Sequence, residues 1–275
     1  MSFGLVLSGG SAYGLANAGV LDVFEKHQVQ PDVIAGSSMG AIIAALYAVG
    51  HDAKTICSLA EELSPLSLVG VSKTPLKGGF HGGMLRQKLE EHLAPLIGDT
   101  TIGETKIPFV CVAGRVKKPI AWSKALSSQF LPHIFDTIEP YIFPKETRIL
   151  DALAASSALP VIFSPIVING ESFVDLCSFG AVPSRSLRSS YHVDVIIGTK
   201  TTPVFRRIKP FLPAGLKAFI QGAEESLGKS LAACDLVIEP KLIGSLFDFH
   251  KSNVLIEAGR QVTEDMWPEI EKLLQ

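Results

Sequence analysis

The chain has 275 residues, of which 47% are hydrophobic and 19% are charged, and its formal net charge is −2. This length and apolar content suffice for a sizeable buried core, whereas the small net charge, with no long run of either sign, argues against a nucleic-acid-binding protein. No uninterrupted apolar segment of the sequence reaches the ~20 residues that a membrane-spanning helix needs.

The first predicted element is a short buried strand, Phe3–Leu7, which is followed by a glycine-rich loop and by a helix over 15–26. A loop in this position can cradle an anion with its backbone N–H groups. It does not match a nucleotide-binding fingerprint, because Ser11 or Ala12 replaces the second glycine of one pattern and Leu15 replaces the lysine of the other. We therefore expect an oxyanion cradle. The N-terminal apolar stretch is too short for a secretory signal peptide and lacks its basic flank.

A second buried strand, Val33–Ala35, runs into an apolar helix that begins near Met39, and the turn between them carries Gly36-x-Ser38-x-Gly40. This pattern is typical of a nucleophile elbow, a strained turn that lifts a serine hydroxyl clear of the backbone. Only residues without a Cβ atom fit at the two flanking positions. The alternative interpretation is a small-residue turn that allows close helix–strand packing. If the two strands form a parallel βαβ unit, the glycine loop and Ser38 meet at the carboxyl edge of the sheet.

The middle of the chain is predicted to continue the alternation of helices and strands. We expect helices over 52–63, 83–97 and 150–159, a buried strand over 108–114 and an edge strand over 117–122. Residues 64–83 contain two prolines and five glycines. We interpret them either as a mobile flap over a site or as a surface excursion.

The C-terminal half begins with two short strands, predicted within 167–174 around an Asn169–Gly170 turn. Asp175 follows them directly, and an aspartate at the end of an apolar strand is either exposed at the sheet edge or buried and paired. Further strands are predicted over 193–198 and 235–239, and a helical tail over 254–274. Basic and aromatic residues alternate within 201–232, which indicates either contact with an anionic lipid surface or a packed helix with solvated charges. The residues concerned are Phe205, Arg206, Arg207, Lys209, Phe211, Leu212, Lys217 and Phe219.

The four cysteines, Cys57, Cys111, Cys177 and Cys234, are scattered and show no metal-binding or redox spacing. We interpret them as buried free thiols in a reducing compartment. Together with the missing signal peptide, this predicts a cytoplasmic protein, with peripheral membrane contact as one interpretation of the basic and aromatic segment.

Five sequence blocks stand in an order and spacing that are specific when taken together. They are Leu7–Gly14 with Asn17–Leu21, Gly36–Gly40, Ala155–Pro160 with Phe163 and Pro165, Val174–Asp175 with Val182–Pro183, and Leu255–Gly259. In these blocks the chain resembles the patatin-like phospholipase family over nearly all of its length.

The resemblance implies an α/β fold, a three-layer α/β/α sandwich with a mostly parallel central sheet, as a single domain over 1–275. It implies hydrolysis of acyl esters in lipids by a Ser-Asp dyad, with Ser38 as nucleophile, Asp175 as base, and neither a metal nor an organic cofactor. The partner would be a lipid or another acyl ester and not a nucleic acid. The oxyanion hole would consist of the N–H groups of Gly9, Gly10, Ser11 and Met39, supported by the motif glycines Gly14, Gly36 and Gly40.

The sequence departs from the family pattern at four positions. Ser11 replaces the usual third glycine of the loop, Tyr13 an arginine, and Leu176 and Cys177 the small residues after the aspartate. These departures leave open a catalytically weakened lipid- or acyl-binding module. A Ser-His-Asp esterase also remains open, since two histidines follow Asp175 in the order that class requires. They are His192 and His250.

Overall fold

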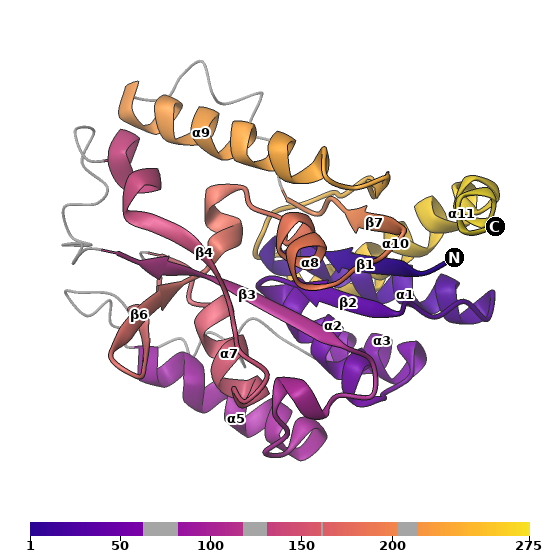
Figure 1. The fold of residues 1–275 in the computed structure, drawn as a ribbon, viewed down its shortest axis with the longest axis horizontal. Coiled ribbons are helices and arrows are strands. Elements are labelled where there is room, and N and C mark those ends of the chain that lie inside the picture. The colour runs from indigo at the N-terminus through magenta and orange to yellow at the C-terminus, as the bar shows by residue number, and fades with distance from the viewer. Residues whose placement is uncertain (63–81, 118–130, 161, 203–213) are drawn as a thin grey trace.

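The computed structural model describes the chain except for residues 63–81, 118–130, 161 and 203–213, and it places an eight-stranded sheet at the centre (Figure 1). The strands are β1 (Phe3–Leu7), β2 (Val33–Gly36), β3 (Phe109–Val116), β4 (Ile138–Ile142), β5 (Ile166–Ile168), β6 (Glu171–Val174), β7 (Val195–Thr199) and β8 (Leu236–Ile238). Their order is β5-β6-β3-β2-β1-β7-β8, and β4 pairs with β3 off this path. The pairs among β1, β2, β3, β7 and β8 are parallel, whereas β4, β5 and β6 add antiparallel pairs at one end.

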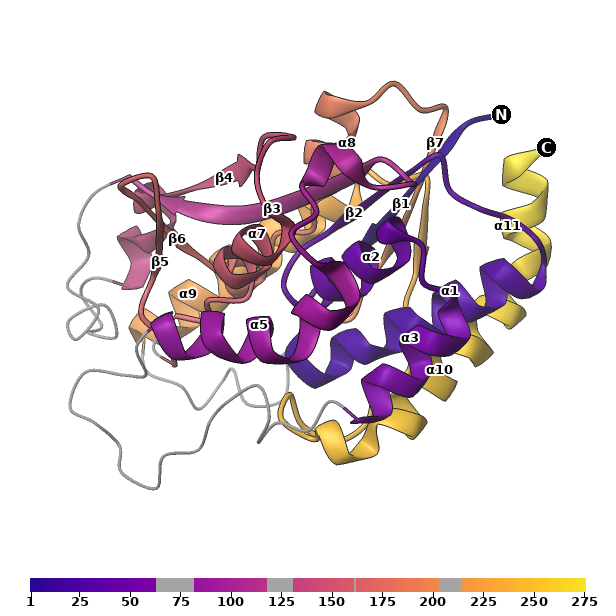
Figure 2. The same ribbon diagram turned by 90° about the horizontal axis from the view of Figure 1, so that it is seen from below.

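Helices cover both faces of this sheet, which confirms the predicted three-layer α/β/α sandwich (Figures 1 and 2). The α-helices are α1 (Ala16–Lys26), α2 (Met39–Val49), α3 (Ala53–Glu62), α5 (Gly82–Ile97), α7 (Ile149–Ser156), α8 (Ser184–Ser190), α9 (Ala214–Leu231), α10 (Ser252–Asp265) and α11 (Trp267–Leu274). Short 3-10 helices include η1 (Ser11–Leu15), η3 (Leu131–Thr137) and η4 (Leu176–Phe179). Helices α8 and α9 pack on one face, and the larger group that includes α1, α2, α5, α7 and α10 packs on the other.

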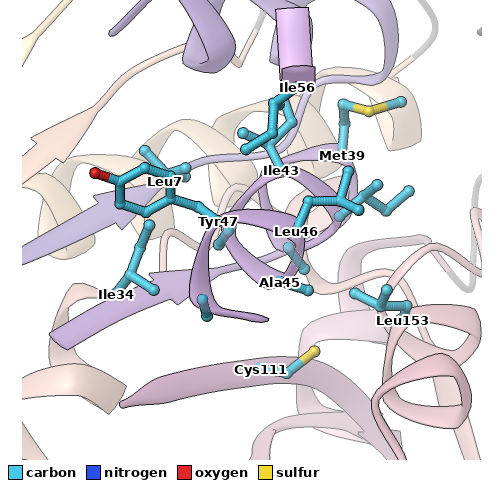
Figure 3. Close-up of a cluster of buried hydrophobic side chains, with 14 of the residues drawn as sticks. Leu7, Ile34, Met39, Ile43, Ala45, Leu46, Tyr47, Ile56, Cys111 and Leu153 are labelled. Atoms are coloured by element: carbon cyan, nitrogen blue, oxygen red, sulfur yellow. The ribbon is translucent and has the colours of Figure 1, made fainter. Parts of the chain in front are cut away.

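The core is divided by the sheet into two clusters, because successive side chains of a strand point to opposite faces. In β1, Leu5 and Leu7 face α2, whereas Val6 faces α8. With both faces covered, the central strands β1, β2 and β7 are buried along their whole length. Helix α2 lies at the centre of the larger cluster, where its side chains lie among residues of the strands, such as Leu7, and of the helices α3 and α7 (Figure 3). Every residue from Met39 to Ala48 is buried, so the start of this helix is firmly placed.

Most of the strands and helices expected from the sequence are confirmed. The hairpin turn has positive φ at both Asn169 (51°) and Gly170 (81°), as a tight two-residue connection requires. Strand β4 and helix α8 were not predicted. Strand β4 contains Pro140, which weakens the strand signal, and such a residue is tolerated because this strand lies at the edge of the pairing with β3.

Three predictions for the middle and C-terminal segments fall on the undescribed ranges. The flap proposed for 64–83 and the edge strand over 117–122 lie almost wholly outside the described residues. So do the basic and aromatic positions between 205 and 212. In the described helix α9, Phe219 packs against Phe135 and Phe179, with ring centroids 5.5 and 5.9 Å apart. This part of the segment is therefore a packed helix, which was one of the two interpretations of the basic and aromatic residues.

Helices α1 and α10 cross at closely approaching backbones. A Cβ atom at Gly19 would lie 2.0 Å from the Ile256 carbonyl oxygen, and one at Gly259 would lie 2.0 Å from the Ala16 carbonyl oxygen. Beside this crossing the Arg260 guanidinium pairs with Asp22 at 2.6 Å. A glycine on each helix thus sets the distance at which α10 closes over α1.

We expect Gly19→Ala to lower the free energy of unfolding by about 1–3 kcal/mol, because the added methyl group meets backbone and the helices must move apart. Urea denaturation followed by circular dichroism measures this change. The matched control is Gly228→Ala on α9, where a Cβ atom meets nothing within 4 Å. The control should be neutral or stabilising by up to ~1 kcal/mol. Equal stability of the two variants would contradict the close crossing.

Candidate active site

Ser38 lies in a strained turn between β2 and α2. Its backbone dihedral angles are φ 56° and ψ −131°, a conformation that residues with a side chain rarely adopt. A Cβ atom at Gly36 would lie 2.5 Å from the Ala41 Cα atom, and one at Gly40 would lie 2.3 Å from the Leu7 carbonyl oxygen. The two glycines are therefore required by close backbone approach, and the turn has the geometry that the sequence pattern predicts for an elbow.

A buried serine on α7, Ser156, is hydrogen-bonded to this turn. The Ser38 N–H group donates to Ser156 Oγ at 2.9 Å, and the Ser156 hydroxyl donates to the Val112 carbonyl oxygen at 2.7 Å. The hydroxyl thus links the elbow to β3, and the N–H group of Ser38 itself is already hydrogen-bonded. Ser156 stands in one of the family-like blocks, but nothing in its sequence context indicated this bond.

Asp175 follows β6 directly and forms the N-cap of η4. Its Oδ1 atom accepts the Cys177 N–H group at 2.8 Å, and the carboxylate is also hydrogen-bonded to the Ser178 N–H group and to the Ser38 side chain. Only 3% of the residue is exposed. Of the two placements expected for this aspartate, the buried and paired one is correct. The structure therefore brings together two side chains that are 137 positions apart in the sequence numbering.

Burial dominates the electrostatics of this carboxylate. Removal from water disfavours the charged form and raises the pKa of Asp175 to about 6, although the hydrogen bonds from Ser38, Cys177 and Ser178 oppose the rise. The group is thus mostly ionised at neutral pH and more basic than an ordinary aspartate. A buried, ionised carboxylate beside a serine hydroxyl can accept the hydroxyl proton.

The glycine loop after β1 packs directly against the elbow. A Cβ atom at Gly9 would lie 2.7 Å from the Ser38 Cβ atom, so only glycine fits there. The next two residues have positive φ, 139° at Gly10 and 53° at Ser11. In the part of the chain that the structure describes, the N–H groups of Gly10, Ser11 and Met39 have no hydrogen-bond acceptor.

Cys177 occupies the space between the loop and the elbow. Its Sγ atom accepts the Gly9 N–H group at 3.2 Å, and the thiol donates to Ser37 Oγ at 3.2 Å. Burial raises the pKa of the thiol to about 12, so it stays protonated at neutral pH. The sequence predicted Cys177 as a buried free thiol and marked it as a departure from the family pattern, but it did not reveal this contact.

The remaining candidate residues lie as follows. A Cβ atom at Gly14 would meet the Met39 Cβ atom at 2.7 Å, so this glycine lets η1 pack on α2. The histidines of the Ser-His-Asp alternative, His192 and His250, are exposed, whereas Ser38 and Asp175 are buried.

Among the described residues, no group of three or more His, Cys, Asp or Glu side chains is arranged to bind a metal ion. None of the described helices combines the length and apolarity needed to cross a bilayer.

Comparison with known proteins indicates one family for the chain. A family model described as patatin-like phospholipase matches residues 5–175, which is more than half of the chain. Lysophospholipase NTE1 of Saccharomyces cerevisiae is 28% identical over 209 residues, covering 74% of this chain and 11% of that protein. Triacylglycerol lipase 5 of the same yeast is 49% identical over 55 residues, covering 20% of this chain and 7% of that protein. The chain thus spans a small fraction of the length of these relatives.

The fold has a counterpart among solved structures. Human GIVD cytosolic phospholipase A2, in complex with a fluorophosphonate inhibitor, superimposes with a TM-score of 0.52 at 12% sequence identity. The superposition covers 99% of this chain and 59% of the human chain. At this level of identity the likeness concerns the fold alone.

We expect Asp175→Asn to reveal the cost of burying the charge. Because its pKa is raised from 3.8 to about 6, the folded state binds the proton more tightly than the unfolded state. Wild-type protein should lose on the order of 3 kcal/mol of stability from this group as pH rises from 4 to above 6, and the uncharged variant should avoid that loss. Urea denaturation of both proteins from pH 4 to 8 measures the difference. A difference in stability that is constant over this range would contradict a raised pKa.

Proposed function

Because the chain belongs to the patatin-like phospholipase family, we propose that it is a lipid acyl hydrolase in which Ser38 is the nucleophile and Asp175 its general base. The observation that supports this most strongly is the hydrogen bond between the Ser38 side chain and the buried Asp175 carboxylate. The strained turn aims the hydroxyl away from the backbone, and the raised pKa suits the carboxylate to accept its proton. Each of these features would be costly to maintain for packing alone.

In the first half-reaction Ser38 Oγ attacks the ester carbonyl carbon while its proton passes to Asp175. The carbonyl oxygen takes up the electron pair and becomes an oxyanion. When the tetrahedral intermediate collapses, the bond to the alcohol breaks and Asp175 returns the proton to the leaving oxygen. Water then attacks the acyl-enzyme, again with Asp175 as base, and releases the fatty acid.

The oxyanion is stabilised in this proposal by N–H groups of the glycine loop and the start of α2. Gly10, Ser11 and Met39 supply N–H groups without an acceptor among the described residues. The fourth group, that of Gly9, donates to the Cys177 sulfur in the present structure. A thiol sulfur is a weak acceptor, so an oxyanion can compete for this N–H group. Loss of one donor typically costs about 10²–10³ in rate.

The proposal predicts that Ser38→Ala and Asp175→Asn each lower turnover of a short-chain p-nitrophenyl ester by at least about 10³-fold. The first removes the nucleophile, and the second removes the base without changing the shape of the side chain much. Ser184→Ala is the control, since this serine is equally buried but lies on α8 and donates to the Ser230 carbonyl oxygen. Melting temperatures of all three variants separate loss of chemistry from loss of fold.

Two further results test the assigned roles. In wild-type protein kcat/KM should rise with pH through about 6 and level off above it, because the base must be ionised. A fluorophosphonate probe should label Ser38 in wild-type protein. Turnover that persists in either variant contradicts the dyad, and an unlabelled wild-type protein without turnover favours the lipid-binding module.

We further propose that the protein meets its substrate at a lipid surface through an apolar patch beside η1. By this patch we mean the three large apolar side chains exposed within residues 243–254, Ile243, Phe247 and Val254, which are 59%, 52% and 47% exposed. The segment that carries Ile243 and Phe247 is bound to η1, because Ala12 N–H donates to the Leu246 carbonyl oxygen at 2.9 Å and the Tyr13 hydroxyl donates to the Gly244 carbonyl oxygen at 2.7 Å.

The small area of this patch also favours a lipid surface over a protein as its partner. Three side chains exposed to about half offer on the order of 300 Å², well short of the ~800 Å² that each partner contributes to a standard protein interface. Insertion of a few apolar side chains is, by contrast, enough for reversible contact with a bilayer.

The double variant Ile243→Ser, Phe247→Ser is therefore expected to sediment with phosphatidylcholine vesicles containing phosphatidylglycerol at least about tenfold more weakly than wild-type protein. Its turnover of a soluble short-chain ester should not change, because neither residue touches the site. Val167→Ser is the control, since Val167 on β5 is 58% exposed but lies outside the patch. Equal vesicle binding by all three proteins would rule out the patch as the contact surface.

A further inference from the structure

Four buried polar side chains lie beneath the glycine loop, and none of them has a part in the mechanism above. They are Ser8, Asn17, Thr199 and Thr201, and all are 0% exposed. We infer that Thr201 is a positioning residue for the oxyanion hole, because its hydroxyl fixes the orientation of the Gly9–Gly10 peptide. This inference rests on the proposed function, since it concerns the same reaction.

The direction of the hydrogen bonds around Thr201 follows from counting protons. The Thr201 N–H group donates to Ser8 Oγ at 2.8 Å, and the Ser8 and Thr201 hydroxyls lie 2.8 Å apart. Each hydroxyl carries one proton. Ser8 Oγ has two threonine neighbours, Thr201 Oγ1 at 2.8 Å and Thr199 Oγ1 at 3.4 Å. When Ser8 donates its proton to the nearer one, the single hydroxyl proton of Thr201 is directed to the Gly9 carbonyl oxygen at 2.7 Å. The more distant acceptor, the Ser8 carbonyl oxygen at 3.1 Å, already receives Asn17 Nδ2 at 2.9 Å.

This bond determines where the Gly10 N–H group points. The described chain contains no cis peptide bond, and in a trans peptide the C=O and N–H groups point in opposite directions. Because the Gly9 carbonyl oxygen is held toward Thr201, the Gly10 N–H group is held away from it. That group is one of the N–H groups without an acceptor among the described residues.

The Gly9–Gly10 peptide needs such an external restraint, because the hydrogen bond that the loop makes within itself, from Tyr13 N–H to the Gly10 carbonyl oxygen at 3.1 Å, holds the next peptide. Gly10 has a φ of 139°, and a glycine can leave this conformation at little steric cost. A Cβ atom at Gly10 would lie 2.3 Å from the Thr201 carbonyl oxygen, so a bulkier and stiffer residue does not fit there. The restraint therefore has to come from a neighbouring element, and Thr201 is the residue that makes contact.

A second ring of hydrogen bonds fixes the preceding peptide in the same way. Ser8 N–H donates to Thr199 Oγ1 at 3.0 Å, Thr199 Oγ1 donates to Asn17 Oδ1 at 2.7 Å, and Asn17 Nδ2 returns to the Ser8 carbonyl oxygen. The Ser8 carbonyl is thus directed toward Asn17, and the Gly9 N–H group is directed to the opposite side, where the Cys177 sulfur lies. Since β7 pairs with β1 in parallel, Thr199 and Thr201 lie directly under the loop.

The test compares kcat and KM of Thr201→Val, Thr201→Ser and Thr263→Val with those of wild-type protein and Ser38→Ala. We expect Thr201→Val to lower kcat about 10–100-fold, somewhat less than the loss of a donor, and to leave KM nearly unchanged. Thr201→Ser keeps the hydroxyl and should stay within about threefold of wild type in kcat. The pH–rate profile of Thr201→Val should keep its midpoint, because Asp175 is untouched.

Thr263→Val is the matched control for structural damage. Thr263 is also 0% exposed, and its hydroxyl also donates to a carbonyl oxygen at 2.7 Å, that of Gly259, but it lies on α10 away from the loop. It should lose thermal stability as Thr201→Val does while keeping kcat. Should Thr201→Val not fold, Thr201→Ala removes the same hydroxyl without placing a methyl group among polar atoms.

Several results would overturn the inference alone. These are a Thr201→Val enzyme with wild-type kcat, an equal loss in Thr201→Ser, or a change confined to KM, each in the presence of turnover that requires Ser38. If wild-type protein shows no turnover that Ser38→Ala abolishes, the proposed function fails, and the role of Thr201 fails with it.

Discussion

The desolvated carboxylate of Asp175 is the constraint on which the site depends. A charge in this position is tolerated only because Cys177 N–H, Ser178 N–H and the Ser38 hydroxyl direct hydrogen bonds to it. Strand register brings these partners together. Gly36 of β2 lies opposite Cys111 of β3, and Gly114 farther along β3 lies opposite Val174 of β6. The elbow and the aspartate therefore meet over β3, where the parallel part of the sheet changes to its antiparallel additions.

The strain at Ser38 is maintained by the packing of α2. An isolated turn would relax a φ of 56° toward a more common conformation. Here the helix that follows is buried from Met39 to Ala48, and Ser156 of α7, whose hydroxyl donates to β3, accepts the N–H group of Ser38. Relaxation of the turn would require the central helix of the larger core cluster to move. The geometry of this turn is thus stabilised by apolar contacts that take no part in the proposed chemistry.

How much the sequence predicts depends on how local the information is. The strands β1 and β2, the elbow, the hairpin at Asn169 and the candidate pair Ser38 and Asp175 follow from short motifs or from a family-like order of motifs. Hydrogen bonds between distant residues do not. Thr201 reaches Gly9 across 192 positions and Cys177 reaches it across 168, and no periodicity or spacing encodes such contacts. Strand β4 was missed for the opposite reason, because a local signal, Pro140, points away from the strand that tertiary pairing imposes.

The departures from the family pattern fall at positions where the backbone can accept them. Ser11 has a φ of 53°, in the left-handed region that a serine can enter at a cost of about 1–2 kcal/mol. Gly10, at 139°, lies where a side chain is excluded. Cys177 has room for its side chain because η4 turns the sulfur toward Gly9, which has no Cβ atom of its own. The two loop residues that must be glycine are glycine, and the substitutions change what surrounds the N–H groups. We therefore expect these departures to adjust the strength of the proposed oxyanion hole without removing it.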